Sequence, residues 1–192
     1  MMRALYDWAI RMVESPYALP ILVVISFVES SFFPIPPDIL LIPLVLIRRN
    51  EAFKIALYCT ISSVLGGYFG YFIGDVLYDS VGLWVLNHYN AVAQFEKFTN
   101  AYHEYGAWIV FMAGLTPFPY KIITIASGVV HLDLMVFTIA SLFARGIRFF
   151  FIAWLLWKYG APMKTFIEKN LGWLSVIFFV LLIGCFYLIK FF

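Results

Sequence analysis

The chain has 192 residues, of which 64% are hydrophobic, 20% aromatic and only 12% charged, and its mean hydropathy is +0.91. Soluble domains are nearer half apolar and one quarter charged, so this composition excludes a soluble globular domain and indicates an integral membrane protein. The formal net charge of +2 is too small to indicate a nucleic-acid partner, and the length suits one membrane domain over residues 1–192.

The first segment, residues 1–16, is predicted to be an amphipathic helix lying on the membrane surface. In "MMRALYDWAIRMVE" the apolar and charged side chains fall on opposite faces of a helix. The segment has no continuous apolar core and no small-residue cleavage site, so we do not expect a signal peptide. A short solvated lead-in is the alternative interpretation.

The first predicted repeat, residues 18–74, begins with an apolar stretch that prolines interrupt. Crossing a bilayer core takes about 20 apolar residues, and 18–33 and 39–47 are both shorter than that. Two short limbs joined at Pro34 and Pro36 therefore predict a re-entrant hairpin. The run 52–74 is long enough to be a transmembrane helix.

A polar link, residues 75–105, follows the first repeat. Its second half places aromatic and aliphatic side chains at helical spacing, namely Val92, Phe95, Phe98, Tyr102 and Tyr105. This pattern predicts a second interfacial helix.

The second predicted repeat, residues 106–157, has the same order of elements as the first. Pro117 and Pro119 interrupt an apolar run, and residues 134–157 are then long enough to cross. A further transmembrane helix is predicted at 171–190.

The two halves can be aligned at an offset of 83 residues. This offset places Pro34 over Pro117, Pro36 over Pro119, and Asp38 over Lys121. Paired proline-interrupted segments at corresponding positions are typical of an inverted repeat. The predicted fold is therefore an all-α integral membrane protein, with two re-entrant hairpins that are each followed by a transmembrane helix. A C-terminal transmembrane helix and interfacial amphipathic helices complete it.

The distribution of basic residues supports this layout. If each hairpin returns to its starting side, one side receives only Lys97 and Lys190. The other side receives Arg3, Arg11, Arg48, Arg49, Lys54, Lys158, Lys164 and Lys169. By the positive-inside rule, we expect a cytoplasmic N-terminus and an external C-terminus.

Five ionisable residues fall inside the apolar segments: Glu29, Asp38, Lys121, Arg145 and Arg148. Each costs at least about 2.5–3.5 kcal/mol on insertion scales, so we expect them to line one interior site that binds substrate or protons. Arg145 and Arg148 are i, i+3 neighbours on one helix face, and arginine suits phosphate. The offset predicts that Asp38 approaches Lys121. The alternative is that all five are structural pairs or reach the interface.

The glycines, histidines and cysteines indicate less specific roles. Gly66, Gly70 and Gly74 form a ridge that favours close helix packing, and the alternative is a lining of the transport path. The spacing of His131 and Asp133 is too weak to indicate a metal site. Cys59 and Cys185 lie inside apolar runs, so we expect no disulfide and no metal-binding cysteines.

Three blocks of the sequence resemble the motif blocks of the DedA family of bacterial inner-membrane proteins. They are "VESSFFPIPPDILL", "LGGYFGYFIG" and "FMAGLTPFPYKIITIASG", and the third is most similar to the YqaA-like branch. The resemblance implies paired re-entrant loops and movement of lipids, including polyprenyl phosphates, between leaflets. It assigns functional roles to Glu29 and Asp38.

The sequence departs from this family where two arginines are expected in the third block. Gly114 stands at the first position and Tyr120 at the second, with Lys121 one residue beyond; in the middle block, Gly67 replaces a common Asp. We therefore expect the cationic role to pass to Lys121, Arg145 and Arg148.

The leading hypothesis is a transporter or scramblase for a phosphate-headed lipid. The alternatives are a scaffold that assists membrane assembly without transport and an enzyme acting on lipid phosphates. We expect no enzyme, because no nucleophile–base pair accompanies the cations. Membrane lipids are the expected partners, with no nucleic acid and no cofactor. The sequence leaves open proton coupling and association between copies of the chain.

Overall fold

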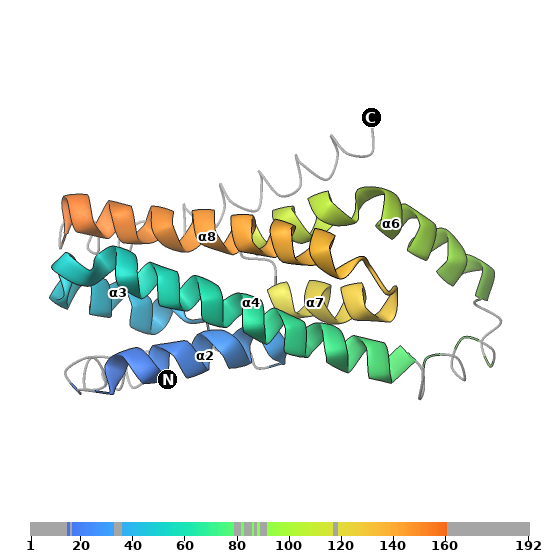
Figure 1. Cartoon of the computed structure of the whole chain (residues 1–192), viewed down its shortest axis with the longest axis horizontal. Coiled ribbons are helices and arrows are strands. Elements are labelled where there is room, and N and C mark those ends of the chain that lie inside the picture. Colours follow the sequence, from blue (N-terminus) through green and yellow to red (C-terminus); the bar gives the residue numbers. More distant parts are fainter. Residues whose placement is uncertain are drawn as a thin grey trace, which may run out of the picture.

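The computed structural model is an elongated bundle of helices (Figure 1). It describes the residues Ser15, 17–32, 36–78, Gly82, Leu86, His88, 92–116 and 119–160. The predicted helices at 1–16 and 171–190, and the residues Pro34 and Pro117, lie outside these residues except for Ser15. Every regular element in the described part is a helix.

Two long apolar helices form the frame of the bundle. They are α4 (Ala52–Leu77) and α8 (Leu134–Tyr159), each of 26 residues. At 1.5 Å per residue each is about 39 Å long, enough for a hydrocarbon core of about 30 Å. Both are long and apolar enough to cross a membrane, at two of the three positions predicted from the sequence; the third, 171–190, lies outside the described residues. Asp133 begins α8 by accepting a hydrogen bond from the Val136 N–H at 2.9 Å.

Three shorter helices lie beside this frame. They are α2 (Ala18–Ser31), α3 (Asp38–Ile47) and α7 (Tyr120–Val129), with 14, 10 and 10 residues, each too short to cross alone. Helix α3 begins directly after Pro37 and α7 directly after Pro119, since proline suits the start of a helix; α3 also contains Pro43 in its interior. A single turn, η1 (Arg49–Glu51), joins α3 to α4.

Helix α6 (Val92–Leu115) is continuous over 24 residues. The sequence predicted an interfacial helix up to Tyr105 and a separate limb beyond it. Gly106 does not end the helix, because it is buried and a side chain there would overlap Leu132. The close contact with Leu132 stabilises a helical glycine that would otherwise weaken the helix.

The short helices pack in a crossed arrangement. Helix α2 lies along α4 and α6 lies along α8, whereas α3 packs on both α8 and α4 and α7 packs mainly on α4. In Figure 1, α3 and α7 accordingly occupy opposite halves of the long axis. Each short helix that follows a proline therefore contacts the long helix of the other half of the chain.

Two apolar clusters form the core. One contains buried residues of α2, α3, α4 and the end of α8, including Leu22, Leu41, Ile55 and Phe149. The other combines α6, α7 and the beginning of α8, including Tyr102, Val110, Tyr120 and Phe137. The middle of α8 therefore lies where the two clusters meet.

Glycines allow α4 to approach two helices closely along one face. A Cβ at Gly66 would overlap the backbone carbonyl of Phe27 in α2, and one at Gly74 would overlap that of Ile125 in α7. Between them, a Cβ at Gly70 would overlap the side chain of Thr124. This face of α4 therefore packs backbone to backbone, which van der Waals contact favours inside a membrane.

We expect Gly74→Ala to lower stability by about 1–3 kcal/mol, because the new methyl group must displace backbone of α7. Gly146→Ala is the matched control, since its Cβ would meet only the Thr60 methyl at 3.8 Å. Thermal unfolding in detergent micelles measures both. Equal melting temperatures for the two variants would contradict the close approach of α4 and α7.

Candidate functional site

Arg145 is the most deeply buried charged residue in the described part of the chain, with a fully inaccessible side chain near the middle of α8. Its Nη2 donates a hydrogen bond to Glu29 Oε2 of α2 at 2.8 Å. Its Nε donates to Ser63 Oγ, near the middle of α4, at 2.6 Å. One guanidinium therefore joins α2, α4 and α8 at mid-height of the bundle.

Two aromatic rings cover the faces of this guanidinium. The Arg145 Cζ atom lies 5.0 Å from the ring centroid of Tyr120 and 4.7 Å from that of Phe149. Tyr120 is itself fully buried and donates its hydroxyl hydrogen to Ser141 Oγ. Cation–π attraction is strongest where water is excluded, so the rings stabilise the charge while holding it in one plane.

Arg148 lies one turn further along α8 and forms a second ion pair. Its Nη2 donates to Asp38 Oδ2, and its Nη1 lies 3.5 Å from the Thr116 carbonyl oxygen. Asp38 is the first residue of α3, where the helix dipole favours a negative charge. The Arg148 and Asp38 side chains are 17% and 21% exposed, against 0% for Arg145 and 16% for Glu29. The second pair is therefore the more accessible of the two.

The predicted approach of Asp38 to Lys121 was wrong: the ionic partner of Asp38 is Arg148. Lys121 is half-buried at the second position of α7 and forms no ion pair with a described residue. The reason is the crossed packing, in which α3 contacts α8 and its arginines whereas α7 contacts α4. The structure therefore pairs four of the five predicted site residues, Glu29, Asp38, Arg145 and Arg148.

Several hydroxyl groups that were not predicted from the sequence also belong to the cluster. Ser63 Oγ lies 2.7 Å from Ser30 Oγ, which also donates to Glu29 Oε2 at 3.2 Å. Thr124 Oγ1 of α7 donates to the Ser30 carbonyl oxygen at 3.1 Å. Polar side chains inside apolar helices need partners, so the serines next to Glu29 and in the middle of 52–74 were the available signal.

Two buried polar atoms of the cluster have no hydrogen-bond partner among the described residues. They are Nη1 of Arg145, a donor, and Oδ1 of Asp38, an acceptor. A buried polar atom without a partner costs about 1–3 kcal/mol, more when it is charged. The cluster therefore retains one open donor and one open acceptor, one on each ion pair.

Gly114 and Tyr120, the two positions where the resemblance led us to expect arginines, both lie against Arg145. A Cβ at Gly114 would lie 2.8 Å from the Ala144 Cβ and 3.7 Å from the Arg145 Cδ, and the Tyr120 ring stacks on the guanidinium. The guanidinium next to these two positions is therefore that of Arg145, which belongs to α8.

His131 and Asp133, which lie between α7 and α8, have separate roles at one end of the bundle. His131 Nδ1 lies 2.8 Å from Asp75 Oδ1, whereas Asp133 caps α8. No group of three His, Cys, Asp or Glu side chains gathers anywhere in the described residues.

Comparison with known proteins places the chain in a family. The model of the VTT domain matches residues 35–158, more than half of the chain, including Asp38, Lys121, Arg145 and Arg148. The chain belongs to the VTT domain family, the DedA family. This agrees with the resemblance of the three motif blocks and with two helices that can cross a membrane.

Two relatives are similar over nearly their whole length. One from Haemophilus influenzae is 35% identical over 184 residues, covering 92% of this chain and 93% of the relative. One from Histophilus somni is 33% identical over 177 residues, covering 90% and 92%. Both are described only as uncharacterized proteins, so neither assigns an activity to the VTT domain protein. No solved structure matches the chain.

A double-mutant cycle on Asp38 and Arg148 tests the observed pairing. We expect Asp38→Asn and Arg148→Gln each to lower stability by about 1–3 kcal/mol, because each leaves the other charge without its partner. The double variant should lose less than the sum of the two, and thermal unfolding in micelles measures all three. Asp38→Asn combined with Lys121→Gln is the control pair, for which strictly additive losses are expected.

Proposed function

We propose that this VTT domain protein moves a phosphate-headed lipid, a phospholipid or a polyprenyl phosphate, between the leaflets of the bacterial inner membrane. The observation that carries the proposal is the partly exposed Asp38–Arg148 pair beside the fully buried Arg145 guanidinium, whose partner Glu29 is also partly exposed, at the middle of the bundle. Ionisable groups at that depth are costly and typically mark a transport path. The proposal gives the protein no enzymatic activity.

The proposed path runs between two re-entrant hairpins related as an inverted repeat. In support, α2 and α3 flank one proline-rich stretch of the sequence, and the end of α6 and α7 flank the other. The crossed packing of α3 on α8 and α7 on α4 is the arrangement that an inverted repeat would produce. Backbone that leaves a helix at membrane depth must face protein or water, so such turns would border a polar path.

In the proposed mechanism the lipid phosphate exchanges with Asp38 as the partner of Arg148. The planar guanidinium can bind two phosphate oxygens at once, which compensates for the lost carboxylate. Asp38 would then take up a proton, because an unpaired carboxylate is costly in a site of low polarity. One phosphate charge and one proton enter together, so the net charge of the cluster is conserved.

Arg145 would have a different part in this mechanism. Its two bound nitrogens are held by Glu29 and Ser63, and only Nη1 is open. We assign it to holding the helices of the path together, because its side chain has no accessible surface. The acyl chains would stay in the bilayer, since only the headgroup needs polar contacts.

We expect Arg148→Ala to slow leaflet exchange by about 10–100-fold, since a hydrogen bond to a charged group contributes about 1.5–3 kcal/mol. The measurement is leaflet exchange of labelled phosphatidylethanolamine, phosphatidylglycerol and polyprenyl phosphate in liposomes that contain purified protein. Lys97→Ala removes an exposed charge on α6 and should exchange lipid at the wild-type rate.

Two results would contradict this function. Wild-type exchange by a folded Arg148→Ala variant would favour the scaffold hypothesis, because the accessible pair would then be dispensable. Release of inorganic phosphate from the labelled lipids would instead indicate an enzyme that acts on lipid phosphates.

The proposed orientation predicts which surfaces are accessible from each side of the membrane. Asn50 and Glu96 are both exposed, in η1 just before α4 and in α6. In a chain without Cys59 and Cys185, Asn50→Cys should react only with a cytoplasmic thiol reagent and Glu96→Cys only with an external one. Reaction of both cysteines from the same side would refute the inverted repeat.

A further inference from the structure

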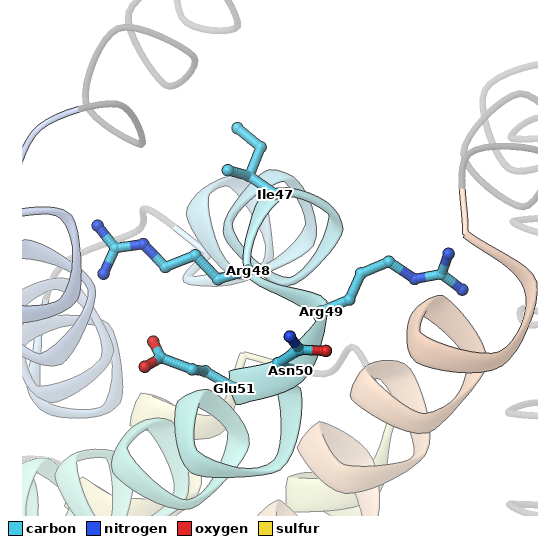
Figure 2. Close-up of a pocket in the computed structure, with 5 residues that line it drawn as sticks. All are labelled: Ile47, Arg48, Arg49, Asn50 and Glu51. Atoms are coloured by element: carbon cyan, nitrogen blue, oxygen red, sulfur yellow. The ribbon is translucent and has the colours of Figure 1, made fainter.

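The link between α3 and α4 borders a hollow that is distinct from the charged cluster. Its volume is about 520 Å³, and it is lined by Ile47, Arg48, Arg49, Asn50 and Glu51 (Figure 2). The hollow lies at the end of the bundle where α4 begins and α8 ends, because Arg49 Nη2 donates a hydrogen bond to the Trp157 carbonyl oxygen.

The two arginines of the link are in different situations. Arg49 is bound to the C-terminal end of α8, and Gly160 gives it room, since a Cβ there would lie 3.2 Å from Arg49 Nη1. Figure 2 shows the Arg48 side chain on the opposite side of the link. The Arg48 guanidinium forms no hydrogen bond or ion pair with any residue that the structure describes. It is therefore the cation of the hollow that can bind a ligand.

The charges at this end of the bundle favour an anion. Among the described residues, the cations here are Arg48, Arg49, Lys54 and Lys158, and the anion is Glu51. The opposite end, formed by the end of α4, the first half of α6 and the start of α8, carries Lys97 against Asp75, Glu96, Glu104 and Asp133. Among the described residues, the hollow thus lies at the end with more cations than anions.

Aromatic side chains indicate that the hollow lies at the level of lipid headgroups. The ring centroids of Phe53 and Trp157 are 5.8 Å apart next to the link, and Lys158 Nζ lies 5.2 Å from the Trp154 ring. Trp and Lys side chains concentrate at membrane–water interfaces, where an apolar body and a polar end are both satisfied. Ile47, 58% exposed, adds an apolar wall to the hollow.

We propose that this hollow binds the phosphate of an anionic phospholipid, with the Arg48 guanidinium as its main contact. The planar donor fork matches two phosphate oxygens, and Ile47 contacts the apolar part of the same lipid. The negative charge of Glu51 repels the phosphate and lowers the affinity of the site for it. This binding site lies outside the charged cluster of Glu29, Asp38, Arg145 and Arg148 and does not require lipid movement.

The test is equilibrium binding to the whole chain in neutral detergent micelles. Phosphatidylglycerol with brominated acyl chains is the probe, and quenching of Trp154 and Trp157 is the signal, after the other four of the six tryptophans are replaced by Phe. We expect quenching at lower concentration with phosphatidylglycerol than with brominated phosphatidylcholine. Arg48→Gln should weaken binding about fivefold, which corresponds to one basic residue near a charged lipid.

Matched variants separate a site from a general surface potential. Arg48→Lys keeps the positive charge but loses the planar guanidinium that can bind two phosphate oxygens, so this variant should also bind the lipid more weakly. Lys54→Gln should change the affinity less than twofold. Glu51→Gln should tighten binding. Wild-type affinity in Arg48→Lys, with equal losses in Lys54→Gln and Arg48→Gln, would overturn the proposal.

Two further results would also overturn it, and they separate it from the proposed transport. Displacement of the lipid by an equal concentration of inorganic phosphate would mean that the hollow is a site for free anions. Loss of binding in Arg148→Ala would place the lipid at the charged cluster instead. Retained binding in Arg148→Ala is the result expected, whether or not lipid exchange occurs.

Discussion

The buried guanidinium of Arg145 is the group on which the rest of this structure depends. It has no exposed surface, and its hydrogen bonds to Glu29 and Ser63 and its rings from Tyr120 and Phe149 come from four helices. Removing one partner from such a pair leaves an uncompensated buried charge, which costs several kcal/mol. The helices must therefore keep this geometry whenever the protein is folded, and the two apolar clusters meet around it.

A second consequence is that the two ion pairs of α8 differ in what they can do. Arg145 is sealed between rings and hydroxyls, whereas Arg148 reaches Asp38 at the start of α3 with both side chains partly exposed. Helix α7 packs on α4 backbone to backbone at Gly74 and Gly128. The contact between α3 and α8, in contrast, includes the Asp38–Arg148 ion pair. An exchange of partners is therefore cheaper at Asp38 than anywhere else in the cluster.

Much of this arrangement could be predicted because its causes are local. Proline explains where α3 and α7 begin, hydropathy explains α4 and α8, and the cost of burying charge explains why Glu29, Asp38, Arg145 and Arg148 find partners. The partner of Asp38 could not be predicted by aligning the repeats, because it depends on which long helix each short helix contacts. Nor could the role of Tyr120 be predicted, since a buried ring reveals its function only through the residue it touches.

The charges of the cluster are not distributed as the alignment of the two halves suggests. Both carboxylates, Glu29 and Asp38, belong to the first half, and both paired arginines belong to α8 of the second half. Each ion pair therefore crosses between the halves, and any motion that separates the halves must break or exchange these pairs. Because the Arg145 pair is too costly to break without a replacement, relative motion should pivot about it. The Asp38–Arg148 pair, which is partly exposed, is then the one that such a motion would break or exchange.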